Sequence, residues 1–274
     1  MLNRLIASVS LLAALTAVSF AAEDGFNMQP AQTGSAPRAV LSTDDIVLPQ
    51  IANGTVPGGQ IYQTIFEAFN LTDFLARVDI TFFDSNGNAM NLPLLTGGIT
   101  VSSGSLSGSV QPRGWARGET VFANVPVQVG YAIVRSQPEG AVAGTARFGN
   151  RVPGERLFQA AIPLETTQHQ RFQVGFTNTG NTVSSLAVVS ANQQTLTFTA
   201  RDTNGQPMCT ATKAFAARQH FPFVLTTLLP CTDNANGVID VQGTASGLSG
   251  VGFLANDRGL GSFVTQQVYG ARIP

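Results

Sequence analysis

Two stretches of the chain alternate apolar and polar residues on either side of a turn motif. Residues 78–83 alternate before Asn86-Gly87, and residues 195–199 alternate before Asn204-Gly205; apolar residues resume after each turn. A period of two predicts a strand with one buried face, and Asn-Gly is favoured in tight hairpin turns. The pattern therefore predicts two equivalent β-hairpins.

Further similarities extend this repeat. Residues 130–150 match residues 237–256, and "FQAAIP" at 158–163 is echoed by "YGARIP" at 269–274. The spacing predicts an all-β chain of two tandem immunoglobulin-like β-sandwich domains, each of about 110 residues. We place them at residues 47–163 and 164–274 and expect each to fold on its own. Their expected cores contain Val78, Ile80, Phe82, Ile133 and Phe148 in the first, and Leu196, Phe198, Val238, Val241 and Leu254 in the second.

Two segments allow more than one interpretation. The run 60–78 has both helical and alternating spacing, and we interpret it as a strand, with a possible short helical turn at residues 71–75. The prolines of "FPFVLTTLLP", residues 221–230, indicate a loop.

The N-terminus has the parts of a secretory signal peptide. Arg4 precedes a short apolar run that ends in small residues, which predicts cleavage after Ala21. The alternative is a membrane anchor, for which the run is only marginally long. Residues 22–46 are polar and low in apolar content, so we expect an extended or disordered segment. The alternative is a strand, from residues 39–49, donated to the sheet edge of a neighbouring subunit.

Several of these pieces together resemble a known bacterial family. "LPQIANG" at 48–54 followed by "IYQTIFEAFNLT", the "DSNGN" and "DTNGQ" hairpins, and the strands "GYAIV" and "GVIDV" are similar to those of exported tandem β-sandwich proteins, frequent in Acidobacteria-like genomes. The resemblance covers most of residues 47–274 and implies an immunoglobulin-like sandwich with a surface or extracellular role. The second repeat departs from it at its start, where the "LPQIANG" signature is missing.

Composition narrows the classes of partner. Charged residues make up 11% of the chain and the formal net charge is −1. This balance gives no electrostatic basis for binding nucleic acid. Apart from the N-terminal run, no segment approaches the length of a membrane span. The expected partners are other proteins or an extracellular polysaccharide.

The chain has two cysteines, Cys209 and Cys231. In an oxidising compartment this pair predicts one intramolecular disulfide, which should stabilise the fold by about 3 kcal/mol. Free thiols and half of a metal site are the alternatives. His169 and His220 are not spaced as zinc ligands, so we expect no metal site and no cofactor.

Sequence motifs for metal binding or catalysis are weak or missing. Asp84-Ser-Asn-Gly-Asn resembles part of a calcium loop but is explained by hairpin chemistry. "TDNANGVID" at 232–240 lacks the acids that a calcium loop needs at its ends. No nucleophile motif is present, and the carboxylates Glu67, Asp73 and Asp79 have no counterparts in the second repeat. The sequence therefore predicts a non-enzymatic protein.

Trp115, the single tryptophan, lies between Arg113 and Arg117 in "PRGWARGE". An exposed tryptophan can stack on a sugar ring or anchor a protein partner; the alternative is a loop side chain folded over the sandwich end. We therefore hold two hypotheses: a secreted or cell-surface interaction protein, or a carbohydrate-binding module that uses these three residues.

Overall fold

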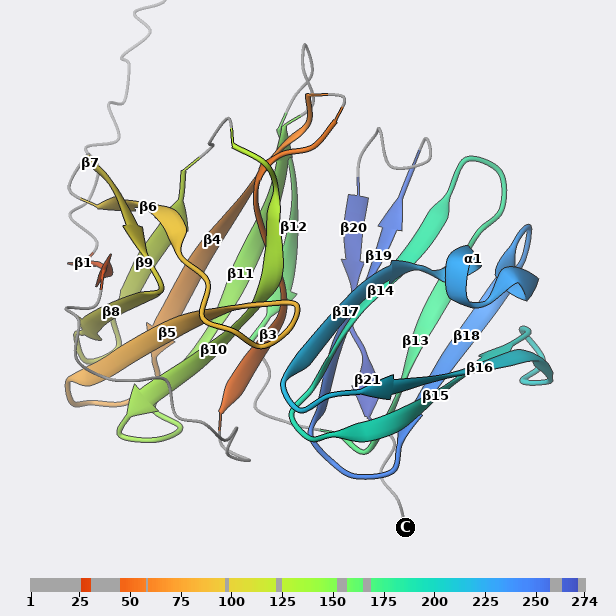
Figure 1. Ribbon diagram of the computed structural model, residues 1–274. Coiled ribbons are helices and arrows are strands. Elements are labelled where there is room, and N and C mark those ends of the chain that lie inside the picture. The colour runs from red at the N-terminus through yellow and green to blue at the C-terminus, as the bar shows by residue number, and fades with distance from the viewer. Residues whose placement is uncertain are drawn as a thin grey trace, which may run out of the picture.

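The computed structural model describes residues 26–30, 45–57, 59–96, 99–121, 125–151, 157–164, 169–256 and 263–270. Strands dominate these residues, and helix within them is limited to α1 (Leu225–Leu228) and the 3₁₀ turn η1 (Pro230–Thr232). Figure 1 shows two β-sandwiches side by side, one in orange to green and one in green to blue. The predicted all-β fold class is confirmed. The signal-peptide prediction lies outside the described residues.

The first half consists of two sheets. Sheet I contains, in spatial order, β2 (Gln29–Pro30), β8 (Ser105–Val110), β5 (Ala76–Asp84), β10 (Gln128–Gln137) and β3 (Ile46–Thr55). Sheet II contains β7 (Ile99–Ser103), β6 (Leu92–Thr96), β9 (Trp115–Thr120), β4 (Ile61–Asn70), β11 (Val142–Arg151) and β12 (Leu157–Pro163), with β1 (Phe26–Asn27) beside β9. The last residues of β3 cross over to pair with β4, which joins the two sheets at one corner.

The second half also consists of two sheets. Sheet III contains β17 (Gln219–Val224), β14 (Val183–Ser190), β19 (Leu248–Ala255) and β20 (Phe263–Gln266). Sheet IV contains β16 (Pro207–Phe215), β15 (Gln194–Arg201), β18 (Asn236–Gly243), β13 (Arg171–Thr177) and β21 (Tyr269–Gly270).

The two halves repeat one strand order. The order β8-β5-β10-β3 in the first half becomes β16-β15-β18-β13 in the second, and β9-β4-β11-β12 becomes β17-β14-β19-β20. In an immunoglobulin domain the first strand joins the second strand's sheet, and the seventh joins the sixth's. Here the first strand of each half pairs with the sixth and the seventh pairs with the second. The sandwiches therefore have the two-sheet architecture with a different strand order.

Each half has its own apolar core. Phe66 of sheet II and Phe82 of sheet I meet across the first core, with ring centroids 5.4 Å apart. Phe198 of sheet IV and Phe223 of sheet III meet across the second, at 5.5 Å. Alternation along β5 and β15 places Phe82 and Phe198 correctly from the sequence, because both strands have one buried face.

Three of the expected core residues lie elsewhere. Val238 and Leu254 are only partly buried; Ile239, next to Val238, is buried in the second core, whereas Val251 of β19 is buried against the first half. Ile133 is buried, but on the outer face of sheet I rather than inside the sandwich. The errors arise because β10, β18 and β19 do not alternate cleanly between apolar and polar residues.

Both predicted turns form, and each is closed by its aspartate. The Asp84 carboxylate accepts hydrogen bonds from the amides of Asn86 and Asn88, at 2.8 and 2.9 Å, and Asp202 does the same for Asn204 and Gln206. The return strands differ. In the second half, β16 pairs with β15 along its length. In the first half, the chain crosses to sheet II after Ala89, and there β6 pairs with β7 and β9. The prediction of two equivalent hairpins is therefore correct for the turns but wrong for the return strand of the first hairpin.

Two local predictions are also corrected. Residues 61–70 form strand β4 as expected, but no helical turn follows, since residues 71–75 are a bent loop. The run 221–230 is not a loop, because Pro222 lies within β17 and α1 follows it. Among the described strands, β17 pairs only with β14 and is an edge strand, and an edge position tolerates the missing N–H of proline. Beyond α1, Cys231 lies 1.98 Å (Sγ to Sγ) from Cys209 of β16, the distance of a disulfide bond.

Part of the polar N-terminal segment is built into the first half. Residues 26–30 are extended and bridge both sheets, with β1 beside β9 and β2 beside β8. Met28 between them is completely buried in the first core. Of the segment considered for donation to a neighbour, Ile46–Pro49 belong to β3 of the chain's own sheet, while residues 39–44 lie outside the described residues.

The outer face of sheet III packs against the first half. On β14, Leu186 and Val188 point into the second core, whereas the alternate residues Ala187 and Val189 are buried against the first half. Ala187 and Val251 join the first core. Val189 forms a cluster with outer-face residues of sheet I: Val47, Phe83, Tyr131 and Ile133. An apolar interface of this kind favours a fixed arrangement of the two halves.

His220 of β17 is the polar centre of this interface and is 1% exposed. Its Nε2–H donates to Gln50 Oε1 at 3.0 Å, its Nδ1 accepts from the Ser85 hydroxyl at 3.0 Å, and its amide donates to the Ser85 carbonyl. All three partners belong to the first half. Burial lowers the pKa of His220 to about 4, so the imidazole is neutral and bridges the halves.

We expect this histidine to make the protein less stable in mild acid. Its pKa is about 4 in the folded chain and 6.5 in the unfolded chain. Between these values the unfolded chain binds a proton that the folded chain does not. The free energy of unfolding therefore has its full value above pH 6.5 and falls as the pH drops towards 4. The loss should reach roughly 3 kcal/mol. Urea unfolding between pH 7.5 and 4.5 should show this slope for the wild type and a flatter one for His220→Gln; equal slopes would contradict it.

Candidate functional site

Large apolar side chains gather at one end of the first sandwich, around the loop that joins β4 to β5. They are 40–53% exposed and are contributed by Phe69 at the end of β4, by the loop residues Leu71, Phe74 and Leu75, and by Trp115 at the start of β9. We call these five residues the loop-end cluster. Exposed apolar groups of this size are more often functional when they lie together than when they are scattered.

Strand register places two members of the cluster side by side. Phe69 and Trp115 are direct partners in the antiparallel pair β4·β9. The next residues along, Ala68 and Ala116, are buried, so alternation turns both aromatic side chains to the outer face of sheet II. Trp115 is therefore not folded over the sandwich end but presented to solvent beside a second aromatic ring.

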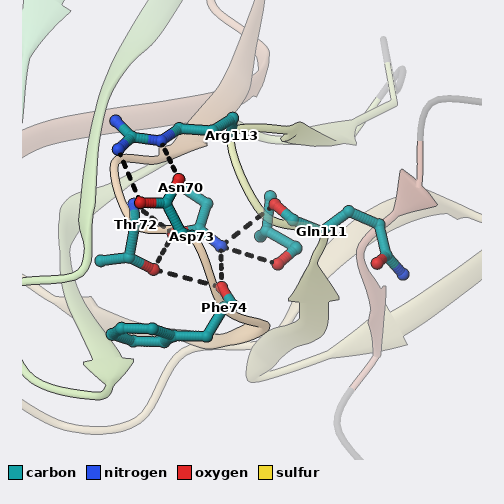
Figure 2. A network of polar contacts seen from close by, with 7 residues as sticks. Asn70, Thr72, Asp73, Phe74, Gln111 and Arg113 are labelled. Atoms are coloured by element: carbon teal, nitrogen blue, oxygen red, sulfur yellow. Dashed lines mark hydrogen bonds and ion pairs between the residues drawn. The ribbon is translucent and has the colours of Figure 1, made fainter.

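A buried asparagine holds the loop in place, as Figure 2 shows. The Asn70 side-chain amide donates to the carbonyl oxygens of Phe74 at 2.7 Å, and of Val110 and Gln111 at 3.0 Å each. Its Oδ1 accepts from the amide and the hydroxyl of Thr72, at 3.0 and 2.7 Å. One side chain thus ties the β4–β5 loop to the β8–β9 turn, and the loop-end cluster rests on a fixed backbone.

The two arginines next to Trp115 are already engaged. Arg113 makes a bidentate ion pair with Asp73, at 2.8 and 3.1 Å, which joins the same two loops at the surface (Figure 2). The hydrogen bond and charge of Arg113 hold the pKa of Asp73 below its usual value. Arg117 pairs with Glu119 of its own strand at 2.5 Å. A polar ligand would have to compete with these carboxylates.

The sequence identified only part of this site. It singled out Trp115, Arg113 and Arg117, and the structure brings these together at one end of the first half. It missed Phe69 and the three apolar loop residues, because a strand or helix period along residues 60–78 does not indicate which apolar side chains gather at the surface. The available signal was "LTDFL", in which apolar residues persist at a point where the alternation of β4 has ended.

Across the described ranges, no three His, Cys, Asp or Glu side chains gather as metal ligands would. In the same ranges, no helix has the length and apolar character that crossing a bilayer requires.

Comparison with known proteins assigns no family. No family model matches the chain, and no curated protein matches it. Among solved structures, the B domain of a biofilm-associated protein aligns with 88% of this chain and 85% of its own, at 8% identity and a TM-score of 0.23. The BSP domain of a biofilm-associated protein aligns with 87% of this chain and 62% of its own, at 8% identity and a TM-score of 0.20. These scores are too low to establish a common fold.

Removing the Asn70 side chain should destabilise the first half. Asn70→Ala removes the acceptor of the Thr72 amide and one donor from each of three carbonyl oxygens, of which those of Phe74 and Gln111 keep a second donor. We therefore expect a loss of about 2 kcal/mol in the free energy of unfolding. Thr72→Val removes one hydroxyl from the same network and should lose less than about 1 kcal/mol. Urea denaturation measures both, and equal losses would show that Asn70 does not organise the loop.

Proposed function

We propose that this chain is an exported, non-catalytic interaction protein that binds a protein partner through the loop-end cluster. The observation that carries this proposal is the exposure of five large apolar side chains on a backbone fixed by Asn70. Because the loop is already ordered, little conformational entropy is lost when a partner covers it. The disulfide and the predicted signal peptide support an extracellular or surface location.

The chemistry of the cluster favours a protein over a polysaccharide. A sugar site combines an aromatic platform with side chains free to bond hydroxyl groups, whereas Trp115 has Phe69 beside it and two arginines held in ion pairs. Central aromatic residues surrounded by apolar contacts are typical of the hot spots of protein interfaces. Carbohydrate binding through Trp115, Arg113 and Arg117 is the competing hypothesis.

Replacing Trp115 should weaken partner binding without unfolding the protein. The mature chain is immobilised, and proteins captured from the surface fraction of the producing cells are identified and purified for titration. We expect Trp115→Ala and Phe74→Ala each to weaken the purified partner's binding at least about 30-fold, as the loss of a hot-spot residue does.

Tyr269→Ala is the matched control, since this aromatic residue is 69% exposed on the second half. It should bind as the wild type does. Unchanged binding by the two cluster variants would contradict the proposal. Loss of binding to a polysaccharide, with no protein partner captured, would favour the carbohydrate-binding hypothesis instead.

A further inference from the structure

A cavity of about 420 Å³ lies between the two halves. Its walls come from β3, β4, β10 and β11 on one side and from β14, β17 and β19 on the other. The volume falls in the range of small-molecule sites, which often form where two domains meet. The loop-end cluster contributes no residue to it, so this is a separate site.

The cavity wall is mainly apolar and uncharged. Phe148 stacks on Tyr62 with ring centroids 5.2 Å apart, and lies 5.9 Å from Phe253 of the second half. These three rings form a continuous wall across the interface. Of the described residues that line the cavity, none is acidic or basic. A charged ligand would lose its hydration here with no opposite charge to compensate for it.

One polar atom buried in the cavity wall lacks a partner among the described residues. Asn150 is 2% exposed and lines the cavity on the same side of β11 as Phe148. Its Oδ1 makes no hydrogen bond within the described part of the chain. Buried carbonyl oxygens are nearly always satisfied, and an unsatisfied one calls for an explanation. A ligand with a hydroxyl or N–H group would supply the missing donor.

We infer that this cavity binds an uncharged, mainly apolar small molecule carrying one hydroxyl or N–H group, such as a hydroxylated aromatic compound. The apolar body lies against the three rings, and the donor bonds to Asn150 Oδ1. Because the site forms only where the two halves meet in the folded chain, the ligand stabilises the folded state, by an amount that grows with the logarithm of its concentration above the dissociation constant.

Three probes of one shape test this assignment on the mature chain. Naphthol has the apolar body and the donor, methoxynaphthalene lacks the donor, and naphthoate is charged. We expect naphthol to bind saturably at one site and raise the melting temperature. Methoxynaphthalene should bind at least about tenfold weaker, which corresponds to about 1.4 kcal/mol, and naphthoate should not bind.

Two variants locate the site. Asn150→Leu should weaken naphthol about tenfold and leave methoxynaphthalene unchanged, a split that general loss of structure would not produce. Ala255→Trp, at a partly exposed lining position, should fill the cavity and weaken both probes. Melting curves without probe establish that each variant is folded.

Four outcomes would overturn the assignment. They are the absence of naphthol binding up to its solubility, equal affinity for naphthol and methoxynaphthalene in the wild type, binding unaffected by both variants, and binding lost in Trp115→Ala. The last would place the probe on the loop-end cluster. Trp115→Ala should therefore bind naphthol as the wild type does.

Discussion

The packing of sheet III on the first half is the constraint on which the rest of the structure depends. A sandwich strand normally buries every second residue, but β14 buries Ala187 and Val189 on its outer face as well as Leu186 and Val188 on its inner face. Apolar burial on both faces leaves the two sandwiches little freedom to separate, since separation would expose this surface to water. The position of His220 and the existence of the cavity both follow from this packing.

The repeated strand order is used differently in the two halves. The turn at Asp84–Asn88 reaches the second half, where Ser85 bonds His220 and Phe83 lies under the Arg218 guanidinium, 4.4 Å from ring centroid to Cζ. The equivalent turn at Asp202–Gln206 faces open space. In the first half the chain after the turn crosses to sheet II and forms β6 and β7, additions without a counterpart in the second half. The same local chemistry therefore closes both turns, and tertiary contacts decide what each turn does.

The sequence predicted those features that depend on local chemistry. The Asp-x-Asn-Gly turns and the alternation of β5 and β15 can be identified in the amino-acid sequence, because each depends on residues close together in it. The repeat is visible because this local chemistry recurs in the second half. It did not predict the outer-face burial of Ile133, the strand position of Pro222 or the core position of Met28. Each of these depends on contacts with residues far away in the sequence. The second half covers Ile133, Pro222 lies on the edge strand of sheet III, and Met28 fills the space between sheets I and II. The loop-end cluster was recognised only at Trp115 and its arginines, since the role of Asn70 requires knowing that residues 110 and 111 lie beside it.

The two matched turns offer the most direct test that the halves form one unit. Gly87 and Gly205 have nearly equal φ values of 81° and 79°, so alanine meets the same backbone strain at both, about 1 kcal/mol. A methyl group at Gly87 would lie 2.8 Å from the Arg218 carbonyl oxygen, whereas at Gly205 no atom of the described residues, apart from the adjacent residues in the chain, lies within 4 Å of one. The measurement is the free energy of unfolding of the mature chain with each substitution. If the turn is packed against the second half, Gly87→Ala should lose at least about 1 kcal/mol more than Gly205→Ala. Equal losses would mean that the two halves are not packed together as described.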